Sequence, residues 1–326
     1  MIFDLHCDTL YELYKKKKTG EALSLASSEL AIDEKKLSLG NYTAQCFAAW
    51  VTQRHENPYL VCKEIIEIFR EELKKSEILA PVSEYTDVIR NMENKKISAI
   101  LSLEDAMPIG TDMERLREFY ELGVRMIALV WNYPNPVGYP NYDMSKPVLE
   151  GASQIPDTVR GLTEFGRELV SEMNRLGIIV DVSHLSDAGF YDVCEISQKP
   201  FVASHSNARS VCSHVRNMTD RMLKKLAESG GVVGINYFES FMNNDKIRGR
   251  ETVNCFIEHM KHIKNIIGYD HIALGSDFDG IGKGTELETA KDMPNLIDGL
   301  LRHGVSESDI EKITYKNALR VFRESI

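Results

Sequence analysis

The sequence predicts a single (β/α)8 barrel, and three observations support that fold class. Eight short runs of apolar, β-branched residues recur along the 326 residues and alternate with helical patterns. These runs are hydrophobic on both faces, as the strands of a buried parallel sheet must be. The length lies within the ~200 to 400 residues of such barrels. No linker or internal repeat divides the chain, so residues 1–326 are expected to form one domain.

The expected strands follow one another in βα alternation, which favours a parallel sheet. They span residues 2–6, 44–50, 98–103, 125–130, 178–183, 201–204, 232–236 and 272–275. Apolar residues make up 43% of the sequence, which is enough for the large core that a barrel of this size requires.

Amphipathic helices are expected between these strands. Asp157 is placed to cap a helix whose apolar face runs from Val159 to Leu176, and Gly177 should end that helix. The segment that begins at Ser306 resembles a capping box that opens the last helix. Similar amphipathic patterns cover residues 60–73, 220–229 and 251–267.

A polar stretch from Asn132 to Ile155 follows the fourth expected strand and has no periodicity. Together with Pro156 it contains five prolines. Barrel enzymes carry their chemistry on the loops that follow the strands. We therefore expect this stretch to form a long loop over the active face.

Composition limits the partners of the protein. The net charge of −10, from 39 basic and 49 acidic residues, argues against nucleic acid or an anionic membrane surface as a partner. No run approaches the ~20 apolar residues that span a bilayer, and no secretory leader or lipid-anchor pattern is evident. The six cysteines lack paired spacing. We expect a cytoplasmic protein with reduced thiols.

Residues of the types that bind metal ions fall at the ends of four expected strands. His6 and Asp8 follow the first strand and, being two residues apart, point to the same side. Glu104, His184 and His205 follow the third, fifth and sixth strands. An unpaired charge is costly to bury, so a core would not select residues of these types. The pattern indicates a metal centre at the carboxyl ends of the strands.

Three imidazoles with carboxylates suit Zn²⁺ or a similar divalent ion. Glu104 is placed to bridge two ions ~3.5–4 Å apart, with His6 and Asp8 completing one site and His184 and His205 the other. Two such ions lower the pKa of a shared water and supply hydroxide at neutral pH. Two Zn²⁺ ions are therefore the expected cofactors.

The eighth expected strand ends in an acidic motif, Gly275-Ser276-Asp277-Phe278-Asp279-Gly280. Asp277 is interpreted as the base that orients the water and passes its proton to the leaving amine. Asp279 is the competing acid, which either caps the following turn or exchanges roles with Asp277. Asp277 is favoured because it comes first after the strand.

These segments resemble the renal (membrane) dipeptidase family within the amidohydrolase-type metal barrels. The likeness extends essentially from end to end and implies a binuclear zinc dipeptidase, a metallopeptidase, with the ligand set given above. It also implies that Glu104 bridges the metals and that Asp277 is the catalytic aspartate. The matching segments are residues 4–8, Glu104, residues 181–184, residues 204–208, the pair Arg216-Asn217, residues 275–280 and residues 317–322.

Three further residues are implied in substrate binding. Arg216 matches the family's arginine that pairs with the free carboxylate of the substrate, and a guanidinium fork fits a carboxylate bidentately. Many family members have a histidine at the end of the fourth strand, where it binds the substrate and stabilises the oxyanion. Here Trp131 stands at that place, and its indole N–H is only a donor. Asn132 or a metal ion would then take over the oxyanion.

The expected function is hydrolysis of the peptide bond in dipeptides by a zinc-bridging hydroxide, with a C-terminal D-residue also accepted. One alternative is another amidohydrolase reaction, on a lactam, an N-acyl amine or a phosphoester. The other is a non-catalytic metal-binding barrel. A substrate without a carboxylate would gain nothing from Arg216, and a scaffold has no use for an open water site. The family also gives the basis for expecting a homodimer.

Overall fold

The computed structural model describes residues 1–145, 155–244, 251–284 and 286–326. Nearly all residues of its strands are buried, as in a sheet that is covered on both faces. The strands are β1 (Ile2–Asp4), β2 (Tyr42–Trp50), β3 (Leu79–Pro81), β4 (Ile97–Glu104), β5 (Val124–Ala128), β6 (Ile179–Asp181), β7 (Val202–Ala203), β8 (Val232–Ile235) and β9 (Ile272–Leu274).

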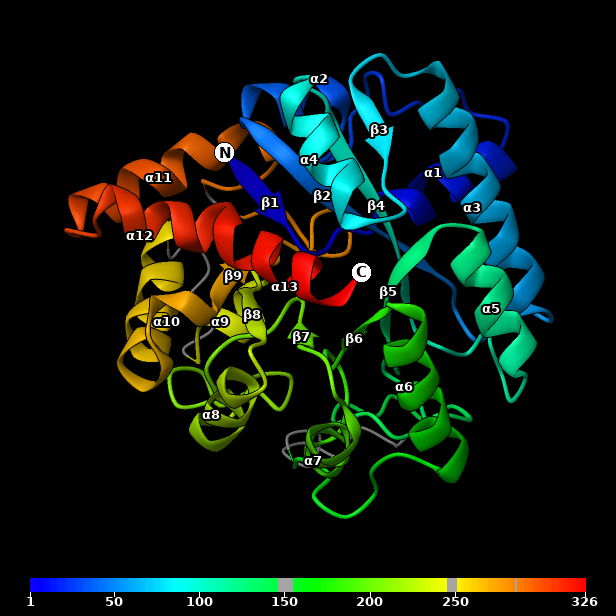
Figure 1. The fold of residues 1–326 in the computed structure, drawn as a ribbon. Coiled ribbons are helices and arrows are strands. Elements are labelled where there is room, and N and C mark those ends of the chain that lie inside the picture. Colours follow the sequence, from blue (N-terminus) through cyan, green and yellow to red (C-terminus); the bar gives the residue numbers. More distant parts are fainter. Residues whose placement is uncertain (146–154, 245–250, 285) are drawn as a thin grey trace.

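Among the described residues, eight of these strands close into a parallel barrel, which confirms the predicted fold class (Figure 1). The order around the ring is β2-β1-β9-β8-β7-β6-β5-β4, and the pairing of β2 with β4 closes it. The short β3 was not predicted. It pairs with the beginning of β4, where Leu79 lies opposite Ile97, while β5 pairs with the end of β4.

Most of the described helices surround the ring on its outer side, and the others lie at its ends (Figure 1). They are α1 (Thr9–Lys18), α2 (Glu34–Leu39), α3 (Pro58–Lys75), α4 (Tyr85–Glu93), α5 (Met113–Glu121), α6 (Glu164–Leu176), α7 (Asp187–Ile196), α8 (Asp220–Glu228), α9 (Glu239–Met242), α10 (Thr252–Ile267), α11 (Met293–Arg302), α12 (Glu307–Glu311) and α13 (Asn317–Ser325). The 3-10 helices are η1 (Tyr269–His271) and η2 (Ala290–Asp292), and the π-helix is η3 (Lys312–Lys316).

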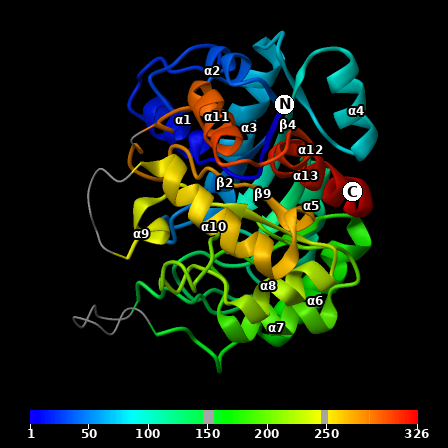
Figure 2. The ribbon, with the colours of Figure 1, turned by 90° about the vertical axis from the view of Figure 1, so that its left-hand side faces the viewer.

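The core has two layers. One layer fills the space between the strands and the surrounding helices. The other fills the barrel interior and includes side chains of α13, where Phe322 packs on Phe3 with ring centroids 5.0 Å apart. Figure 2 shows α13 at one end of the barrel and α9 at the other. Because α13 closes the end at which the strands begin, the carboxyl ends of the strands are left for the site.

The helix expected after Asp157 begins later than predicted. Thr163 is its N-cap and accepts a hydrogen bond from the backbone N–H of Gly166, so that α6 starts at Glu164. The carboxylate of Asp157 instead accepts from the N–H of Val159 and caps a separate turn. The predicted end is confirmed, because Gly177 takes a left-handed conformation with φ 80°.

The other predicted helices correspond to α3, α8 and α10, with ends that differ by a few residues. Ser306 is the N-cap of α12, which continues through η3 into α13, so it does open the last helical run. Of the predicted 132–155 loop, residues 146–154 lie outside the described residues. Asn141 from this loop donates its backbone N–H to the carbonyl of His184, so the loop reaches the carboxyl end of β6. In the described part of the chain, no helix has the length and hydropathy needed to cross a bilayer.

Candidate metal centre

The predicted ligand residues meet at one rim of the barrel. His6 follows β1, Glu104 is the last residue of β4, and His184 and His205 follow β6 and β7. The Nε2 atom of His6 lies 3.4 Å from Oδ2 of Asp8 and 3.5 Å from Oε2 of Glu104. Because parallel strands end on the same side, side chains that are distant in sequence converge there.

The second oxygen of Glu104 faces the other two histidines. Its Oε1 lies 3.0 Å from Nε2 of His184 and 3.7 Å from Nε2 of His205. The two imidazole Nε2 atoms are themselves 3.0 Å apart. One oxygen of Glu104 therefore faces His6 and the other faces the pair of histidines, which is the arrangement a bridging carboxylate requires.

Hydrogen bonds determine the tautomer of His205. Asp181 accepts from the Ser204 hydroxyl, and it also accepts the backbone N–H groups of Ser183 and Ser204. Because Ser204 donates its proton to Asp181, its oxygen must accept from Nδ1 of His205, which lies 2.7 Å away. Nδ1 of His205 then carries the proton, and Nε2 presents a lone pair to the site.

Asn132 performs the same task for His184. Its Oδ1 lies 2.8 Å from Nδ1 of His184, so that this nitrogen donates and Nε2 is unprotonated. The side-chain oxygen of Asn132 is thus directed at a predicted ligand. Two neutral imidazoles would then point lone pairs at each other and at Glu104, an arrangement that a cation between them would stabilise.

The charges of the centre also favour a cation. Burial and the neighbouring carboxylate of Glu104 raise the pKa of Asp8 to about 6. Burial and the carboxylate of Asp8 raise the pKa of Asp277 to about 6. Burial works against a charge on His6, but Glu104 and Asp8 outweigh it and raise its pKa well above the usual value. The buried cluster of His6, Asp8, Glu104 and Asp277 therefore carries an excess of negative charge, which divalent ions would neutralise.

A direct fit test supports the same conclusion. Nε2 of His6 is fully buried and has no hydrogen-bond partner among the described residues. The ligand atoms of His6, Glu104 and His205 lie within 4.8 Å of one another, and so do those of His6, Asp8 and Asp277. Imidazole and carboxylate ligands in clusters of this size suit zinc. The residues present therefore fit a metal centre.

Asp277 and Asp279 have different surroundings. Asp277 lies with Oδ1 3.9 Å from Nε2 of His6, and its Oδ2 accepts from the side chain of Asn236 at 2.8 Å. Both oxygens of Asp279 are used elsewhere, by the hydroxyl of Thr9 at 2.6 Å and the N–H of Ala31 at 2.7 Å. Of the two acids, Asp277 faces the predicted ligands, whereas Asp279 ties neighbouring segments together.

The backbone at three of these positions is left-handed. His184 has φ 69°, Asp277 has φ 62° and Asp279 has φ 67°. Few residues other than glycine adopt this conformation, and it tends to occur at functional sites where the surrounding structure enforces it. At His184 and Asp277 it occurs where the side chain faces the other predicted ligands.

A cavity of about 420 Å³ lies over the predicted ligands. Arg216 borders it and is buried, with 4% of its surface exposed. Its Nε has no hydrogen-bond partner among the described residues, and its Nη2 is 3.4 Å from the carbonyl of His205. Burial lowers the pKa of Arg216 to about 10, which leaves it charged. A buried guanidinium without a paired carboxylate is suited to an anionic ligand.

The aromatic part of the cavity includes a residue that was predicted and two that were not. Trp131 follows β5 and lies 6.2 Å from His184, ring centroid to ring centroid. Trp50, the last residue of β2, and Tyr11 of α1 also line the cavity. These two carry no sequence signal of function. Trp50 lies opposite Glu104 in the sheet, so only a comparison of where neighbouring strands end would have identified it.

The serine–aspartate supports were also missed, although a signal for them exists. Asp4 precedes His6 on β1 as Asp181 precedes His184 on β6. Each buried aspartate accepts a serine hydroxyl from a neighbouring strand end, Ser276 for Asp4 and Ser204 for Asp181. An acidic residue two positions before His6 and three before His184, inside an apolar strand, would have pointed to these supports.

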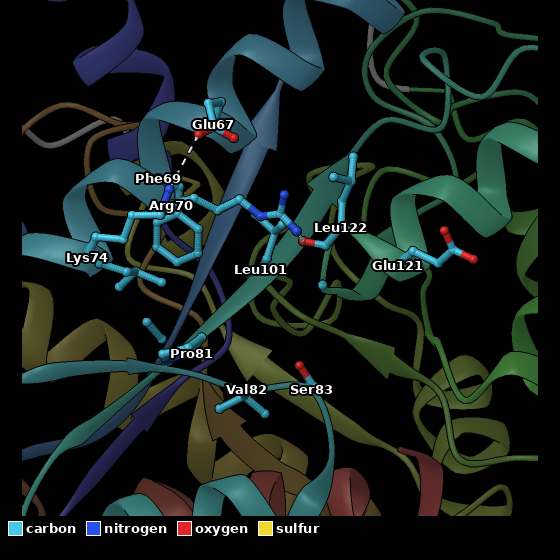
Figure 3. A pocket seen from close by; sticks show the side chains of 13 residues that line it. Glu67, Phe69, Arg70, Lys74, Pro81, Val82, Ser83, Leu101, Glu121 and Leu122 are labelled. Atoms are coloured by element: carbon cyan, nitrogen blue, oxygen red, sulfur yellow. Dashed lines mark hydrogen bonds and ion pairs between the residues drawn. The ribbon is translucent and has the colours of Figure 1, made fainter.

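A second cavity, of about 470 Å³, lies outside the barrel between α3 and α5 (Figure 3). Its two basic side chains are engaged with protein groups: Arg70 donates to the carbonyl of Leu122, and Lys74 pairs with Glu67 at 3.8 Å. Among the described residues that line it there is no histidine or cysteine. This cavity therefore lacks the cluster of imidazoles and carboxylates that the barrel mouth provides.

Comparisons with known proteins agree with this geometry. Residues 1–325 match the family described as membrane dipeptidase, peptidase family M19. A dipeptidase of Claviceps purpurea, TcpJ, is 34% identical over 239 residues, which cover 73% of this chain and 53% of that protein. The crystal structure of dipeptidase AC, an M19 metallopeptidase, has a TM-score of 0.90 at 30% identity and covers 99% of this chain and 98% of that chain.

A solved structure with a ligand is similar to the same extent. It is a metallopeptidase from Rhodobacter sphaeroides bound to a phosphinate mimic of the dipeptide L-Ala-D-Ala. The TM-score is 0.90 at 28% identity, with 100% of this chain and 99% of that chain covered.

Proposed function

The chain belongs to the membrane dipeptidase family, peptidase family M19, and on that premise we propose that it is a metal-dependent dipeptidase. The observation that carries the proposal is the pairing of two groups in one cavity. A cluster of imidazoles and carboxylates surrounds Glu104, and the unpaired guanidinium of Arg216 borders the same cavity. The first suits hydrolysis, and the second suits a substrate with a free carboxylate.

Two Zn²⁺ ions are the proposed cofactors. His6 and Asp8 would hold one, His184 and His205 the other, and Glu104 both. When bound, such ions polarise a carbonyl group and lower the pKa of a coordinated water. The protein holds the ligands in the required state, since Ser204 and Asn132 keep Nε2 of His205 and His184 unprotonated.

Arg216 binds the C-terminal carboxylate of the dipeptide. Because that carboxylate lies directly after the second residue, the fixed position of Arg216 limits cleavage to short substrates. Asp277 accepts a proton from the attacking water and delivers it to the nitrogen of the peptide bond as the C–N bond breaks. Asn236 holds the other oxygen of Asp277 during both steps. One water is consumed and two amino acids leave.

The proposal is tested by zinc content and by amino-acid release from a substrate panel. The panel contains L-Ala-L-Ala, L-Ala-D-Ala, their C-terminal amides, N-acetyl-alanine and a phosphoester. Zinc-loaded protein should hold two ions per chain and cleave the two dipeptides in preference to the rest. Faster cleavage of N-acetyl-alanine or the phosphoester would favour the other amidohydrolase reactions. No cleavage of any compound by the loaded protein would favour a metal-binding scaffold.

Replacement of Arg216 tests the carboxylate contact. In Arg216→Met, KM for the dipeptides should rise by roughly 100-fold, whereas turnover of the amides should change little, because a bidentate charged pair is lost only for the dipeptides. Arg175→Met is the matched control, since Arg175 lies on α6, outside the cavity, and its side chain is 63% exposed. Equal losses on dipeptides and amides would contradict this role for Arg216.

A further inference from the structure

One side of the cavity is built from aromatic rings. Tyr11 and Trp50 meet edge to face with ring centroids 4.6 Å apart and an interplanar angle of 89°. Trp50 and Trp131 meet at 4.8 Å and 63°. All three side chains are half-buried and line the cavity. We call Tyr11, Trp50 and Trp131 the aromatic wall.

The strand order places Trp50, the ring that both other members of the aromatic wall contact, across the barrel from Arg216. In the closed ring, β2 and β7 are four strands apart in either direction, and therefore lie on opposite sides. Trp50 ends β2, whereas Arg216 lies in the connection between β7 and α8. The predicted ligands from β1, β4, β6 and β7 lie around the centre between them. A line from Arg216 across the ligand cluster thus reaches the aromatic wall at Trp50.

This arrangement orients a dipeptide. Its C-terminal carboxylate is held by Arg216, and its peptide bond must lie over the ligand cluster to be cleaved. The N-terminal residue then extends to the far side of the cluster, against Tyr11, Trp50 and Trp131. The C-terminal side chain remains on the side of Arg216, where Phe241 packs 5.3 Å from the guanidinium.

The charges near the aromatic wall do not select a charged side chain. Glu12 and Lys15 also line the cavity, but they pair with each other at 2.6 Å, and Lys15 lies over the ring of Tyr11 at 5.3 Å. The carboxylates of Asp8 and Glu104 are directed at the ligand cluster. A charged side chain of either sign would find no unpaired opposite charge at this place, whereas an aromatic ring would find edges and faces to pack against.

We propose that the aromatic wall is the specificity pocket for the N-terminal residue and selects dipeptides whose first residue is aromatic or a large aliphatic one. This inference rests on the proposed dipeptidase function and adds the class of substrate. Apolar contact in a pocket typically discriminates by a factor of about 10 to 200. The expected order of kcat/KM is Phe-Ala and Leu-Ala above Ala-Ala, with Asp-Ala lowest.

The experiment measures kcat/KM of the zinc-loaded protein for these four dipeptides and for Ala-Phe. For the wild type, Phe-Ala should exceed Ala-Ala by about tenfold or more. In Tyr11→Ala and in Trp131→Leu this ratio should fall by roughly threefold to tenfold, the range for one aromatic pair. Phe241→Leu is the reciprocal control: it should leave the Phe-Ala ratio unchanged and alter the ratio of Ala-Phe to Ala-Ala.

The outcomes separate this inference from the function on which it rests. If no dipeptide is cleaved, the proposed function itself fails. If dipeptides are cleaved but Phe-Ala and Ala-Ala are equal in the wild type, only the aromatic specificity is overturned. The same holds if both substitutions retain zinc and leave the ratio as it was. The wild-type ratio decides the matter even if a variant does not fold.

Discussion

The two halves of the barrel mouth are held in different ways. On the side of β2, β4 and β5, the cavity is bordered by Tyr11, Trp50 and Trp131, which contact one another through ring edges and faces. On the side of β6 to β9, side chains are fixed by directional hydrogen bonds: His205 donates to Ser204, Ser204 donates to Asp181, and Asn236 donates to Asp277.

The difference indicates where the protein tolerates change. Ring packing is less directional than hydrogen bonding and depends mainly on buried area, so that one aromatic or aliphatic side chain can replace another at smaller cost. A hydrogen-bonded network in a buried site loses the protonation state and the orientation of its members when one is removed. The polar half should therefore control reactivity, and the aromatic half should adjust the choice of substrate.

The largest effect is expected for Asp277→Asn on the polar half. The amide can no longer accept the proton of the water, so kcat should fall by roughly 10²- to 10⁴-fold. Metal analysis of the same preparation checks that both ions remain, which matters because Asp277 also lies within ligand range of His6 and Asp8. Unchanged turnover with full metal content would remove Asp277 from the mechanism.

A smaller effect is expected for Ser204→Ala, which removes a single hydroxyl. His205 loses the acceptor that fixes its tautomer, and zinc affinity should fall by roughly 10- to 100-fold, as measured by competition with a chelator. Ser102→Ala is the matched control, because the buried Ser102 hydroxyl on β4 has no hydrogen-bond partner among the described residues. Equal zinc affinities for the two variants would show that Ser204 does not position His205.

The next largest effect is expected for Arg209→Lys, which would displace Arg216 by changing the backbone on either side of it. Arg209 donates to the carbonyls of Val215 and Asn217, the residues on either side of Arg216, and pairs bidentately with Asp187 at 2.7 Å. A lysine keeps the charge but cannot make these bonds together. KM for a dipeptide should rise roughly tenfold through misplacement of Arg216.

The C-terminal amide of the same dipeptide is the control for Arg209→Lys, because it does not use the carboxylate contact. Its kinetics should stay near those of the wild type. A parallel loss on the amide would mean that the substitution damages the site in general.

The smallest effect is expected for Tyr11→Phe on the aromatic half. Like Ser204→Ala, it removes a single hydroxyl, but the ring that contacts Trp50 is kept. The kcat/KM values for Phe-Ala and Ala-Ala should each change by less than about twofold. A large loss here, comparable to that of Ser204→Ala, would erase the contrast between the two halves.

The sequence alone predicted the elements that have a regular hydrophobic pattern or that end at a distinctive residue. Short apolar runs that stop at His6, Glu104, His184 or His205 predicted both the barrel and the convergence of these residues. Three-residue β3 could not be found in this way, since Leu79–Pro81 is too short to show alternation. Thr163 rather than Asp157 caps α6, because both are good caps and only tertiary packing selects between them.

The supports of the site lay further from reach. The roles of Ser204 and Asn236 depend on which strand ends become neighbours in the closed ring, and the aromatic wall joins α1, β2 and the end of β5. Asp4 and Asp181, which precede His6 and His184, are visible in the sequence, but the serine, asparagine and aromatic partners show no local pattern. They follow only once the order of the strands around the barrel is known.

Anomalous scattering at the zinc edge from a crystal of zinc-loaded protein tests the central claim most directly. Two peaks should appear, ~3.5–4 Å apart, one beside His6 and Asp8 and the other beside His184 and His205, with Glu104 between them. A single peak, or peaks away from Glu104, would contradict a binuclear centre in this barrel.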